Sequence, residues 1–410
     1  MKKFKKWLLV VLMALSTLCL AVGLAACNKG NKVQPVAGTP ELEYTLSKDG
    51  TYYIASGLGT CPATEIVIGN TYNDLPVKEI GEKAFSGCTK LTSITISNGI
   101  QTIGAYAFGS WSGFDPETGD EISLDGCIGL TNITIPNSVT VIGEGAFADC
   151  SGLKSVTIGN GVIGIGRSAF AGCGSLKSVK IGKGVQEIGS GAFQNCSSLT
   201  SITIPSSVTK IWDRAFYGCD KLIQTENGVQ YVDKWVVGCD TNVTSVTLRS
   251  KTVGIGNYAF LSCSGLTSIT IPSSVKEIGI GAFYNCSGLK SITIPNSVKE
   301  IGDSAFEGCS SLTSVTIGNG VTSIGGAAFY NCSSLTNITI PSGVTSIGGR
   351  AFLRCSSLTS VTFENTVGWS IPQQYNVPNG FDIESEDLAD PDIAAAYLTS
   401  LYGDYSWQRD

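Results

Sequence analysis

Apolar and polar positions repeat along most of the chain with one fixed period, which is the spacing from Cys196 to Cys219. Within this segment, Leu199, Ile202 and Ile204 are separated by Thr and Ser. This Leu-x-x-Ile-x-Ile run is rich in β-branched residues and predicts a short strand. The other apolar positions of the unit are Val208, Ile211, Ala215 and Phe216. One unit cannot bury its own apolar side, so the repeat predicts a solenoid in which neighbouring units cover one another.

The register of the repeat is clearest at its Ala-Phe pair. Eight of the ten intervals between successive pairs equal the repeat period, and the two longer ones are Phe108 to Phe147 and Phe216 to Phe260. The phenylalanines are Phe85, Phe108, Phe147, Phe170, Phe193, Phe216, Phe260, Phe283, Phe306, Phe329 and Phe352. Stacked strands lie about 4.8 Å apart, so roughly a dozen coils predict a parallel sheet about 55 Å long over columns of Leu, Ile and Phe.

The residues that follow the apolar runs predict the turns of each coil. Pro205 ends its strand because it brings no N–H to the ladder. Other units have glycine turns at this place, as in residues 158–161. Ile-Gly, as at Ile142-Gly143, predicts a second turn with a positive φ at the glycine.

The complete unit, C-x-x-L-x-x-I-x-I-P-x-x-V-x-x-I-G-x-x-A-F-x-x-C, resembles the BspA-like subfamily of bacterial leucine-rich repeats, and the resemblance covers residues 61–363. It implies a β-rich, curved, right-handed solenoid with its parallel sheet on the concave face. Many members of this subfamily are surface-exposed or secreted. Their proposed roles include adhesion to host or matrix proteins and to other cells.

The segments on either side of the repeat predict caps for the terminal coils, which a solenoid needs. Residues 43–60 hold two β-rich runs around an Asp-Gly pair, which is typical of a hairpin. In residues 364–410, Asp390 precedes a proline and an apolar run, and this pattern predicts an N-capped helix. Trp369 and Trp407 belong to the same segment, which we expect to fold back over the last coil.

The first interruption of the repeat, residues 109–126, is an acidic insertion. Its carboxylates are those of Asp115, Glu117, Asp120 and Glu121. Oxygen ligands of this kind suit Ca²⁺, but the segment lacks the EF-hand pattern. A solvated surface loop is the main interpretation, and a calcium site is the alternative.

The second interruption, residues 222–240, predicts a β-hairpin with residues 229–232 paired to residues 235–237. Trp212 stands in the preceding unit where other units have glycine. We expect the hairpin to pack on Trp212. The alternative is an exposed aromatic patch of Trp212 and Trp235, and such residues are common anchors in interfaces.

The three x positions of each Leu-x-x-Ile-x-Ile run face away from the core. They are mostly Thr and Ser, with a basic cluster at Lys154, Lys177 and Lys180 beside Thr200 and Thr203. This hydroxyl ladder either keeps the sheet soluble or forms a broad, low-affinity surface for a protein or a glycan. Its uniformity argues against a high-affinity pocket, which needs a few distinctive groups.

Charge and histidine content exclude several classes of function. Charged residues are 15 % of the chain, and histidine is absent. Four of the 27 Lys and Arg lie in an N-terminal leader that we expect to be removed, which leaves 23 basic and 33 acidic residues. Nucleic acid is therefore not an expected partner, because it requires a basic footprint. The lack of histidine excludes Ser-His-Asp and Cys-His sites and His-ligated zinc.

The N-terminal leader has the layout of an export signal. Residues 1–26 contain a basic start, an apolar run and small residues before Cys27. Leu-Ala-Ala-Cys resembles the bacterial lipobox, which implies cleavage before Cys27 and lipid attachment to it. The alternative is an uncleaved membrane anchor, because the apolar run is just long enough to span a bilayer. Residues 27–42 predict a flexible tether, so we expect the chain to be exported and lipid-anchored on the outer side of the membrane.

A column of cysteines follows the phenylalanines by three residues, and Cys127 resumes it after the first insertion. Its members are Cys88, Cys150, Cys173, Cys196, Cys219, Cys263, Cys286, Cys309, Cys332 and Cys355. Their spacing lacks the local pairing of zinc or redox motifs. Adjacent members come within disulfide range, but their side chains should point the same way into the core. We therefore predict unpaired core thiols and a reducing or anaerobic habitat, although exported proteins usually form disulfides.

The sequence predicts neither catalysis nor a cofactor. Its glycine-rich stretches are repeat turns rather than phosphate loops, and carboxylates such as Glu187, Glu277 and Glu300 do not recur as a facing pair. Two hypotheses remain. One is an adhesion or recognition module that binds an extracellular protein or glycan, and the other is a structural envelope protein that acts through self-association.

Overall fold

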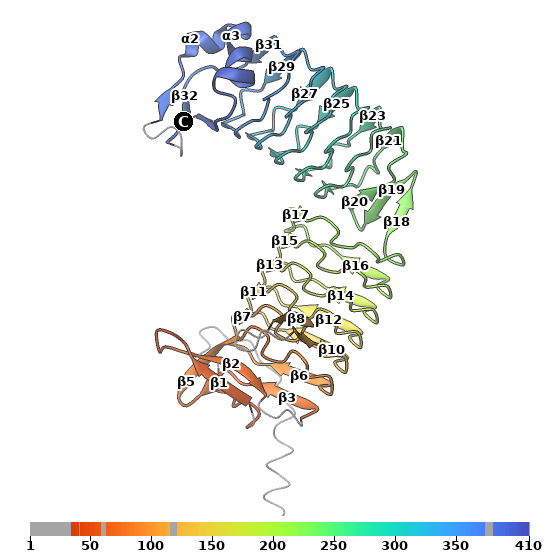
Figure 1. The fold of residues 1–410 in the computed structure, drawn as a ribbon, viewed down its shortest axis with the longest axis vertical. Helices are drawn as coiled ribbons and strands as arrows, with labels where there is room; N and C mark the ends of the chain where they lie inside the picture. The colour runs from red at the N-terminus through yellow and green to blue at the C-terminus, as the bar shows by residue number, and fades with distance from the viewer. Residues whose placement is uncertain (1–33, 41, 59–62, 115–120, 374–379, 410) are drawn as a thin grey trace, which may run out of the picture. The chain divides into compact units, whose positions relative to one another are not determined.

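The computed structural model describes residues 34–40, 42–58, 63–114, 121–373 and 380–409. The chain divides into residues 1–35 and one compact unit, Val36–Asp410. This unit is a β-solenoid, in which successive coils stack through parallel strands (Figure 1). The predicted fold class is confirmed.

The Leu-x-x-Ile-x-Ile runs form the predicted parallel strands, here called the long ladder, but these strands pair in five separate groups rather than in one continuous sheet. Its strands are β3 (Glu65–Ile68), β6 (Ser93–Ile96), β10 (Asn132–Ile135), β12 (Ser155–Ile158), β14 (Ser178–Lys180), β16 (Ser201–Thr203), β21 (Ser245–Thr247), β23 (Ser268–Thr270), β25 (Ser291–Ile294), β27 (Ser314–Ile317), β29 (Asn337–Ile340) and β31 (Ser360–Phe363). Equivalent positions lie opposite each other, as Val156 does with Ile133 and Val179. The alternation of buried and exposed residues along β10 follows from this arrangement.

A second, short ladder runs along the opposite side of the coils (Figure 1). Its strands are β5 (Leu75–Ile80), β7 (Thr102–Ile103), β11 (Val141–Ile142), β13 (Gly164–Ile165), β15 (Glu187–Ile188), β17 (Lys210–Ile211), β22 (Gly254–Ile255), β24 (Glu277–Ile278), β26 (Glu300–Ile301), β28 (Ser323–Ile324) and β30 (Ser346–Ile347). The predicted second turn follows Ile-Gly, at residues 144–149 in one coil, but Gly143 itself has no positive φ. Most of these strands are only two residues long. They are stable because they pair with the strands of neighbouring coils, which fix their positions.

Glycine after this isoleucine fits the close packing between most coils, although Trp212 takes this position in one of them. A Cβ on Gly143 would lie 2.6 Å from the backbone nitrogen of Ala105, and one on Gly166 would lie 2.5 Å from the carbonyl oxygen of Gly143. Positive φ angles occur two residues later, as at Ser168, and again two residues after the phenylalanine, as at Asn195. The chain therefore makes its sharp bends on either side of Ala-Phe.

The segment between the short ladder and the cysteine, residues 189–196 in one coil, is here called the Ala-Phe turn. Its backbone donates three hydrogen bonds to the next coil: Gly191 N–H to the Asp213 carbonyl, Phe193 N–H to that of Ala215, and Asn195 N–H to that of Tyr217, at 3.1, 2.8 and 2.7 Å. The phenylalanine rings stack with nearly parallel planes, and the Phe147 and Phe170 centroids are 5.1 Å apart. Ala-Phe turns thus join the coils along a third line.

The cysteine column lies inside the core. Cys196 Sγ donates a hydrogen bond to the Phe170 carbonyl of the preceding coil, and Cys219 Sγ does the same to Phe193. The cysteines that the structure gives as buried free thiols include Cys150, Cys173, Cys196, Cys219, Cys263, Cys286, Cys309, Cys332 and Cys355. These residues fill space as small apolar groups, in agreement with the sequence-based interpretation.

At the N-terminal end, β1 (Leu42–Leu46) and β2 (Tyr53–Leu58) form the predicted antiparallel hairpin. Strand β2 then pairs in parallel with β5, so the hairpin continues the short ladder beyond its first coil. A two-residue strand, β4 (Thr71–Tyr72), pairs with β5 as well. The rings of Tyr44 and Tyr72 stack at 4.2 Å between centroids, which packs the hairpin onto this end of the repeat.

At the C-terminal end, β34 (Trp407–Arg409) pairs antiparallel with β30 and with β32 (Trp369–Ile371), which in turn pairs with β33 (Phe381–Asp382). The predicted helix is present as α3 (Pro391–Ala396), beside α2 (Ser385–Ala389) and the π-helical η1 (Tyr397–Leu401). The tail thus folds back over the last coil, and the Trp369 and Trp407 rings are buried there. None of the helices in the described ranges has the length and apolar character needed to cross a membrane.

Candidate functional site

The second interruption changes the path of one coil. Its strands are β18 (Gln224–Glu226), β19 (Val229–Val232) and β20 (Trp235–Cys239), with Val232 opposite Trp235 as the hairpin prediction required. Strand β20 also pairs in parallel with β22, where Val236 lies opposite Ile255. Val236 therefore takes the place that isoleucine has in the short ladder of a regular coil.

After Val236 the chain reaches the long ladder by a shorter route. In a regular coil, the path leads from Ile188 of the short ladder to Ile202 of the long ladder. Here the corresponding path leads from Val236 to Val246 and is four residues shorter. The missing residues correspond to the Ala-Phe turn, which this coil does not make.

The omitted turn interrupts the hydrogen bonds that otherwise join the coils. Among the described residues, no partner is found for the backbone N–H groups of Arg214, Phe216 and Gly218. The carbonyl groups that face this break, those of Asn257, Ala259 and Leu261, likewise have no donor within the described part of the chain. Between regular coils these positions are donors and acceptors, so two complementary backbone edges are left open.

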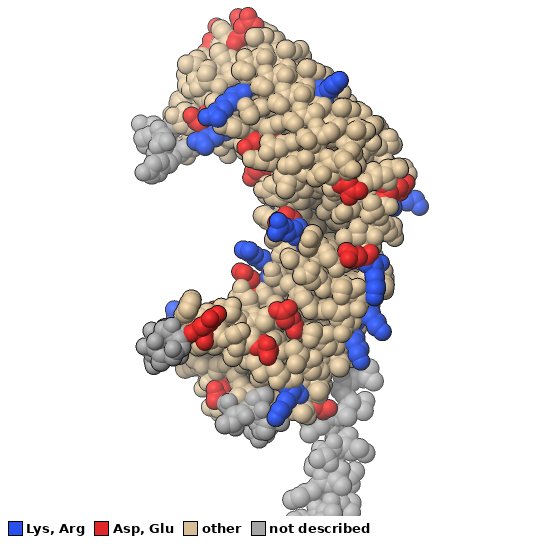
Figure 2. All heavy atoms as spheres, turned by 45° about the vertical axis from the view of Figure 1, so that its right-hand side comes forward, with Lys and Arg blue, Asp and Glu red and all other residues tan. Residues whose placement is uncertain are grey.

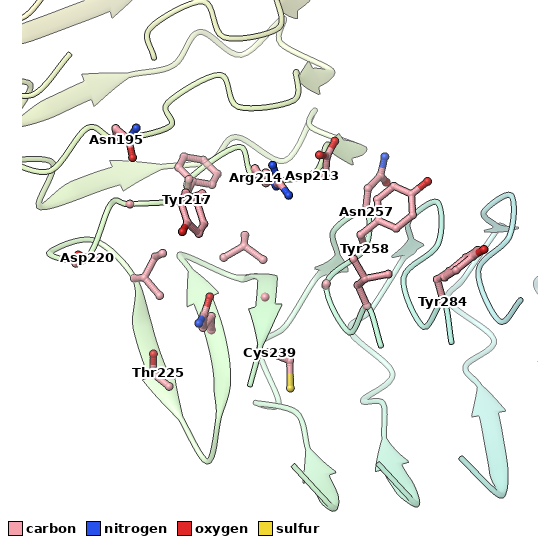
Figure 3. A pocket seen from close by; sticks show the side chains of 18 residues that line it. Asn195, Asp213, Arg214, Tyr217, Asp220, Thr225, Cys239, Asn257, Tyr258 and Tyr284 are labelled. Carbon is pink, nitrogen blue, oxygen red and sulfur yellow. The ribbon is translucent and has the colours of Figure 1, made fainter. Parts of the chain in front are cut away.

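A cavity of about 1100 Å³ lies between these two edges (Figure 3). Its apolar lining includes Phe216, Ile223 and Val237, and Tyr217, Tyr258 and Leu261 are exposed at its rim. The labelled side chains in Figure 3 come from the coils on both sides and from the strands of the insertion. The cavity exceeds the volume that small ligands usually occupy, about 300–1,000 Å³.

The side chain of Asn257 is buried at the edge of the cavity with one polar group unpaired. Its exposed fraction is 4 %. Its Oδ1 accepts a hydrogen bond from Ile280 N–H at 3.0 Å, but its Nδ2 has no partner among the residues that the structure describes. Because a buried polar group without a partner is costly, this amide is suited to donate to a ligand.

The insertion is held firmly beneath the cavity. Asp233 in the hairpin turn accepts a hydrogen bond from Ile204 N–H at 3.0 Å. The Arg249 guanidinium lies 4.0 Å from the Tyr231 ring centroid and donates to Glu226 at 2.7 Å. These contacts fix the floor of the cavity to both neighbouring coils.

Charge within the cavity is low. Asp213, Arg214 and Asp220 are its charged lining residues. A hydrogen bond with the Cys263 thiol and burial both raise the pKa of Cys239, so this lining residue stays a neutral thiol near pH 7. The site is therefore suited to neutral polar and apolar groups rather than to an ionic ligand.

The structure separates the two tryptophans that the sequence analysis joined. Trp235 is 3 % exposed, and its ring lies against Gly254. Trp212 is half-buried beside a hollow of about 620 Å³ that Ile163 and Gly189 also line. Because Trp235 is buried, an exposed patch of both rings is not formed.

The basic cluster is exposed on the long ladder. Lys154, Lys177 and Lys180 form no salt bridge within the described residues, and Lys180 lies between Thr157 and Thr203. Thr200 Oγ1 donates to the Lys177 carbonyl of the preceding coil at 3.3 Å, so part of the hydroxyl ladder serves the fold. Figure 2 shows that charged side chains are sparse on the face that it displays.

Several predicted site residues fall outside the described part. They are Cys27, Asp115, Glu117 and Asp120. Glu121 is exposed at the start of β9 (Glu121–Leu124), which pairs antiparallel with β8 (Trp111–Phe114). The described portion of the chain contains no group of three His, Cys, Asp or Glu side chains arranged to hold a metal ion.

One carboxylate pair was missed by the sequence analysis. Glu277 of β24 lies directly opposite Glu300 of β26, so the statement that no facing pair occurs was wrong. Burial, and secondarily the charge of Glu300, raise the pKa of Glu277. The sequence did contain a signal for this pair, because Glu277 and Glu300 are separated by one full repeat period.

The chain matches a family model described as "BspA type Leucine rich repeat region", in six copies over residues 59–114, 120–236 and 237–359. No curated protein matches it. Among solved structures, it is similar to a leucine-rich repeat protein from Bacteroides ovatus ATCC 8483, with 31 % identity, 79 % of this chain and 88 % of that chain covered, and a TM-score of 0.36. A leucine rich cell surface protein from Faecalibacterium prausnitzii A2-165 is 27 % identical, with 85 % and 98 % covered and a TM-score of 0.37.

Proposed function

We propose that this chain, which belongs to the BspA-type leucine-rich repeat family, is a lipid-anchored cell-surface recognition protein that binds an extracellular protein or glycan. The lipobox-like sequence before Cys27 is consistent with export and lipid attachment. Repeat solenoids typically serve as binding scaffolds because their stacked coils present extended surfaces.

The observation that carries this proposal is the cavity at the second interruption. The regular coils repeat the same hydroxyl groups along the long ladder, which gives a ligand little to distinguish. The cavity instead combines open backbone edges, the unpaired Asn257 amide and the exposed side chains of Tyr217 and Tyr258. Tyrosine is common at recognition surfaces because its ring and hydroxyl contact apolar and polar groups together.

Binding of full-length protein to arrays of host proteins, matrix proteins and glycans tests the proposal. We expect specific capture that falls at least tenfold in a Tyr217→Ser/Tyr258→Ser variant. The charge-reversal variant Lys154→Glu/Lys177→Glu/Lys180→Glu measures the contribution of the basic cluster separately. If no ligand of either class is captured, the recognition function is wrong.

Self-association is the alternative that the sequence left open. Both ends of the repeat are covered, by the β1–β2 hairpin and by β34 with its helices, and such covers disfavour end-to-end stacking. Sedimentation velocity over a hundredfold concentration range separates the two hypotheses. A constant monomeric mass supports recognition, whereas concentration-dependent multimers without a captured ligand support a structural role.

A further inference from the structure

We propose that the cavity at the second interruption binds a segment of polypeptide whose backbone replaces the omitted Ala-Phe turn. This inference rests on the proposed recognition function and names the chemical class of its ligand. It follows from the way in which regular coils fill the corresponding space.

The open backbone groups alternate along each edge of the cavity. Arg214, Phe216 and Gly218 present N–H groups at every second residue on one edge. The carbonyl groups of Asn257, Ala259 and Leu261 have the same spacing on the other edge. A peptide that alternates its own carbonyl and N–H groups can pair with both edges at once, as strands do when they add to a sheet.

A regular coil shows that this pairing is geometrically available. The turn of residues 189–196 donates three backbone N–H groups to the coil that follows it. Its carbonyl groups accept hydrogen bonds from the coil that precedes it, as that of Ala192 does from Phe170 N–H at 2.8 Å. A ligand would donate to the Ala259 carbonyl in the first way and accept from Phe216 N–H in the second. Each such bond also satisfies a backbone N–H or carbonyl group that is otherwise unpaired, which makes it more favourable than a bond between groups already in contact with water.

The cavity lining indicates which side chain the peptide carries. In regular coils a phenylalanine stacks on its neighbours, as Phe193 does on Phe216 at 5.6 Å and Phe260 on Phe283 at 5.0 Å between centroids. No ring stacks between Phe216 and Phe260 in the described structure. With Ile223 and Val237 as an apolar floor, this space is suited to an aromatic or large aliphatic residue preceded by a small one.

A glycan explains these features less well. A sugar can stack on Tyr217 or Tyr258, but its hydroxyl groups do not alternate in register with two backbone edges. The unpaired Asn257 Nδ2 and the carbonyl groups beside it also fit an amide backbone, which offers acceptors and donors in turn. Low charge within the lining disfavours a strongly ionic peptide.

Two probes test the inference on full-length protein. The first is a phage-displayed library of random linear dodecapeptides, and the second is a synthetic peptide with the sequence of residues 188–197 and Ser in place of Cys196. Peptides that bind should be enriched in small-aromatic pairs. N-methylation of one alternating set of backbone amides should weaken binding at least tenfold, and methylation of the other set should weaken it less.

A filled variant supplies the matched control. Residues 237–240 are replaced by the eight residues 189–196, which restores an Ala-Phe turn in the interrupted coil. This variant should bind the selected peptides at least tenfold more weakly, and its thermal midpoint should rise. Insertion of four Gly/Ser residues after Asp240, which adds the same length and keeps the lining residues Val237 and Cys239, should leave binding within about threefold, and Tyr217→Ala reports on the rim if the filled variant does not fold.

The outcomes are distinguishable. Peptide binding that is lost in the filled variant supports the inference. Unchanged peptide binding in a folded filled variant, equal effects of the two methylation sets, or capture of glycans alone overturns it while the recognition function stands. Absence of any protein, peptide or glycan ligand overturns both.

Discussion

Each buried cysteine of the column combines a small volume with a hydrogen bond to the preceding coil. Cys309 Sγ lies 3.3 Å from the Phe283 carbonyl oxygen, and burial raises the pKa of Cys309 to about 12. A thiol with such a pKa is almost entirely protonated near neutral pH, and the protonated form is a poor nucleophile. The column therefore serves packing rather than chemistry.

Thiol titration with a chromogenic disulfide at pH 8 tests this role. We expect most of the column to be silent in the native protein and to react in guanidinium chloride without reductant, because unfolding exposes the thiols and lowers their pKa. Full-length protein made with Cys239→Ser controls for the half-buried thiol at the cavity. Few reactive thiols in both states would mean that the column forms disulfides.

The pair of Glu277 and Glu300 makes stability depend on pH at one position. Burial and Glu300 raise the pKa of Glu277, while Lys210 and Lys276 partly oppose them. A carboxyl group whose pKa is higher in the folded state favours folding when it is protonated, and this advantage is lost as the pH rises through that pKa. At pH 7 the ionised side chain is therefore unfavourable.

Glu277→Gln should raise the thermal midpoint at pH 7, and the gain should shrink as the pH falls through the raised folded-state pKa of Glu277 and vanish below about 4.3, where the unfolded carboxyl is also protonated. Glu187→Gln is the matched control, because Glu187 occupies the equivalent position of β15 between Gly164 and Lys210. Differential scanning calorimetry between pH 3 and 7 measures both. A gain that persists unchanged at pH 3 would contradict the electrostatic cause.

Among the elements, helix α3 depends for stability on Asp390, the residue that caps its N-terminus. The Asp390 side chain accepts hydrogen bonds from the backbone of Asp392 at 3.0 Å and of Ile393 at 3.4 Å. These N–H groups have no partner within the helix, so the carboxylate satisfies them. The Tyr397 hydroxyl donates to Asp387 at 2.7 Å and ties the following turn to α2.

Asp390→Ala should lower the free energy of unfolding of the C-terminal cap by about 1 kcal/mol, whereas Asp390→Ser should retain most of it. Urea denaturation followed by tryptophan fluorescence is suitable, because Trp369 and Trp407 are buried beneath this cap. Equal losses in the two variants would show that the cap bond is not the cause.

The periodicity predicted elements whose apolar positions recur in every coil. Leu199, Ile202 and Ile204 predicted the long ladder, and the Asp-Pro pair at Asp390 predicted the helix start. The short ladder was missed because a two-residue strand has no alternation of its own and depends on contacts with the neighbouring coils. Gly143 looked like a turn residue, although it is glycine because a Cβ would collide with Ala105.

The candidate site was only partly predictable from the sequence. The hairpin around Asp233 followed from its own sequence pattern. The cavity, in contrast, could be inferred only by comparing the number of residues from Val236 to Val246 with the corresponding number in a regular coil. That comparison requires knowing that Val236 replaces an isoleucine of the short ladder, which β20 pairing with β22 establishes. Lys154 and Lys177 could be identified from the sequence because charged residues are conspicuous in a series of Thr and Ser. Unpaired backbone groups could not, because they do not depend on which side chains the residues carry.

For the whole molecule, one omitted turn distinguishes an otherwise uniform solenoid. The stacked phenylalanines form one series that ends at Phe216 and another that begins at Phe260. Between them β20 pairs with β22 but not with β17, so the short ladder is divided here as well, and the third line of contact is lost. The proposed recognition would use, at this place, backbone groups that in regular coils are hydrogen-bonded to the neighbouring coils.

Hydrogen–deuterium exchange resolved to single amides, with and without a captured peptide, tests this account most directly. In the free chain the amides of Arg214 and Gly218 should exchange at least about 100-fold faster than those of Gly191 and Asn195, which are bonded to the next coil. A bound peptide should slow Arg214, Phe216 and Gly218 and leave the regular coils unchanged. Equal protection of both sets in the free chain, or binding that leaves these three amides unprotected, would contradict it.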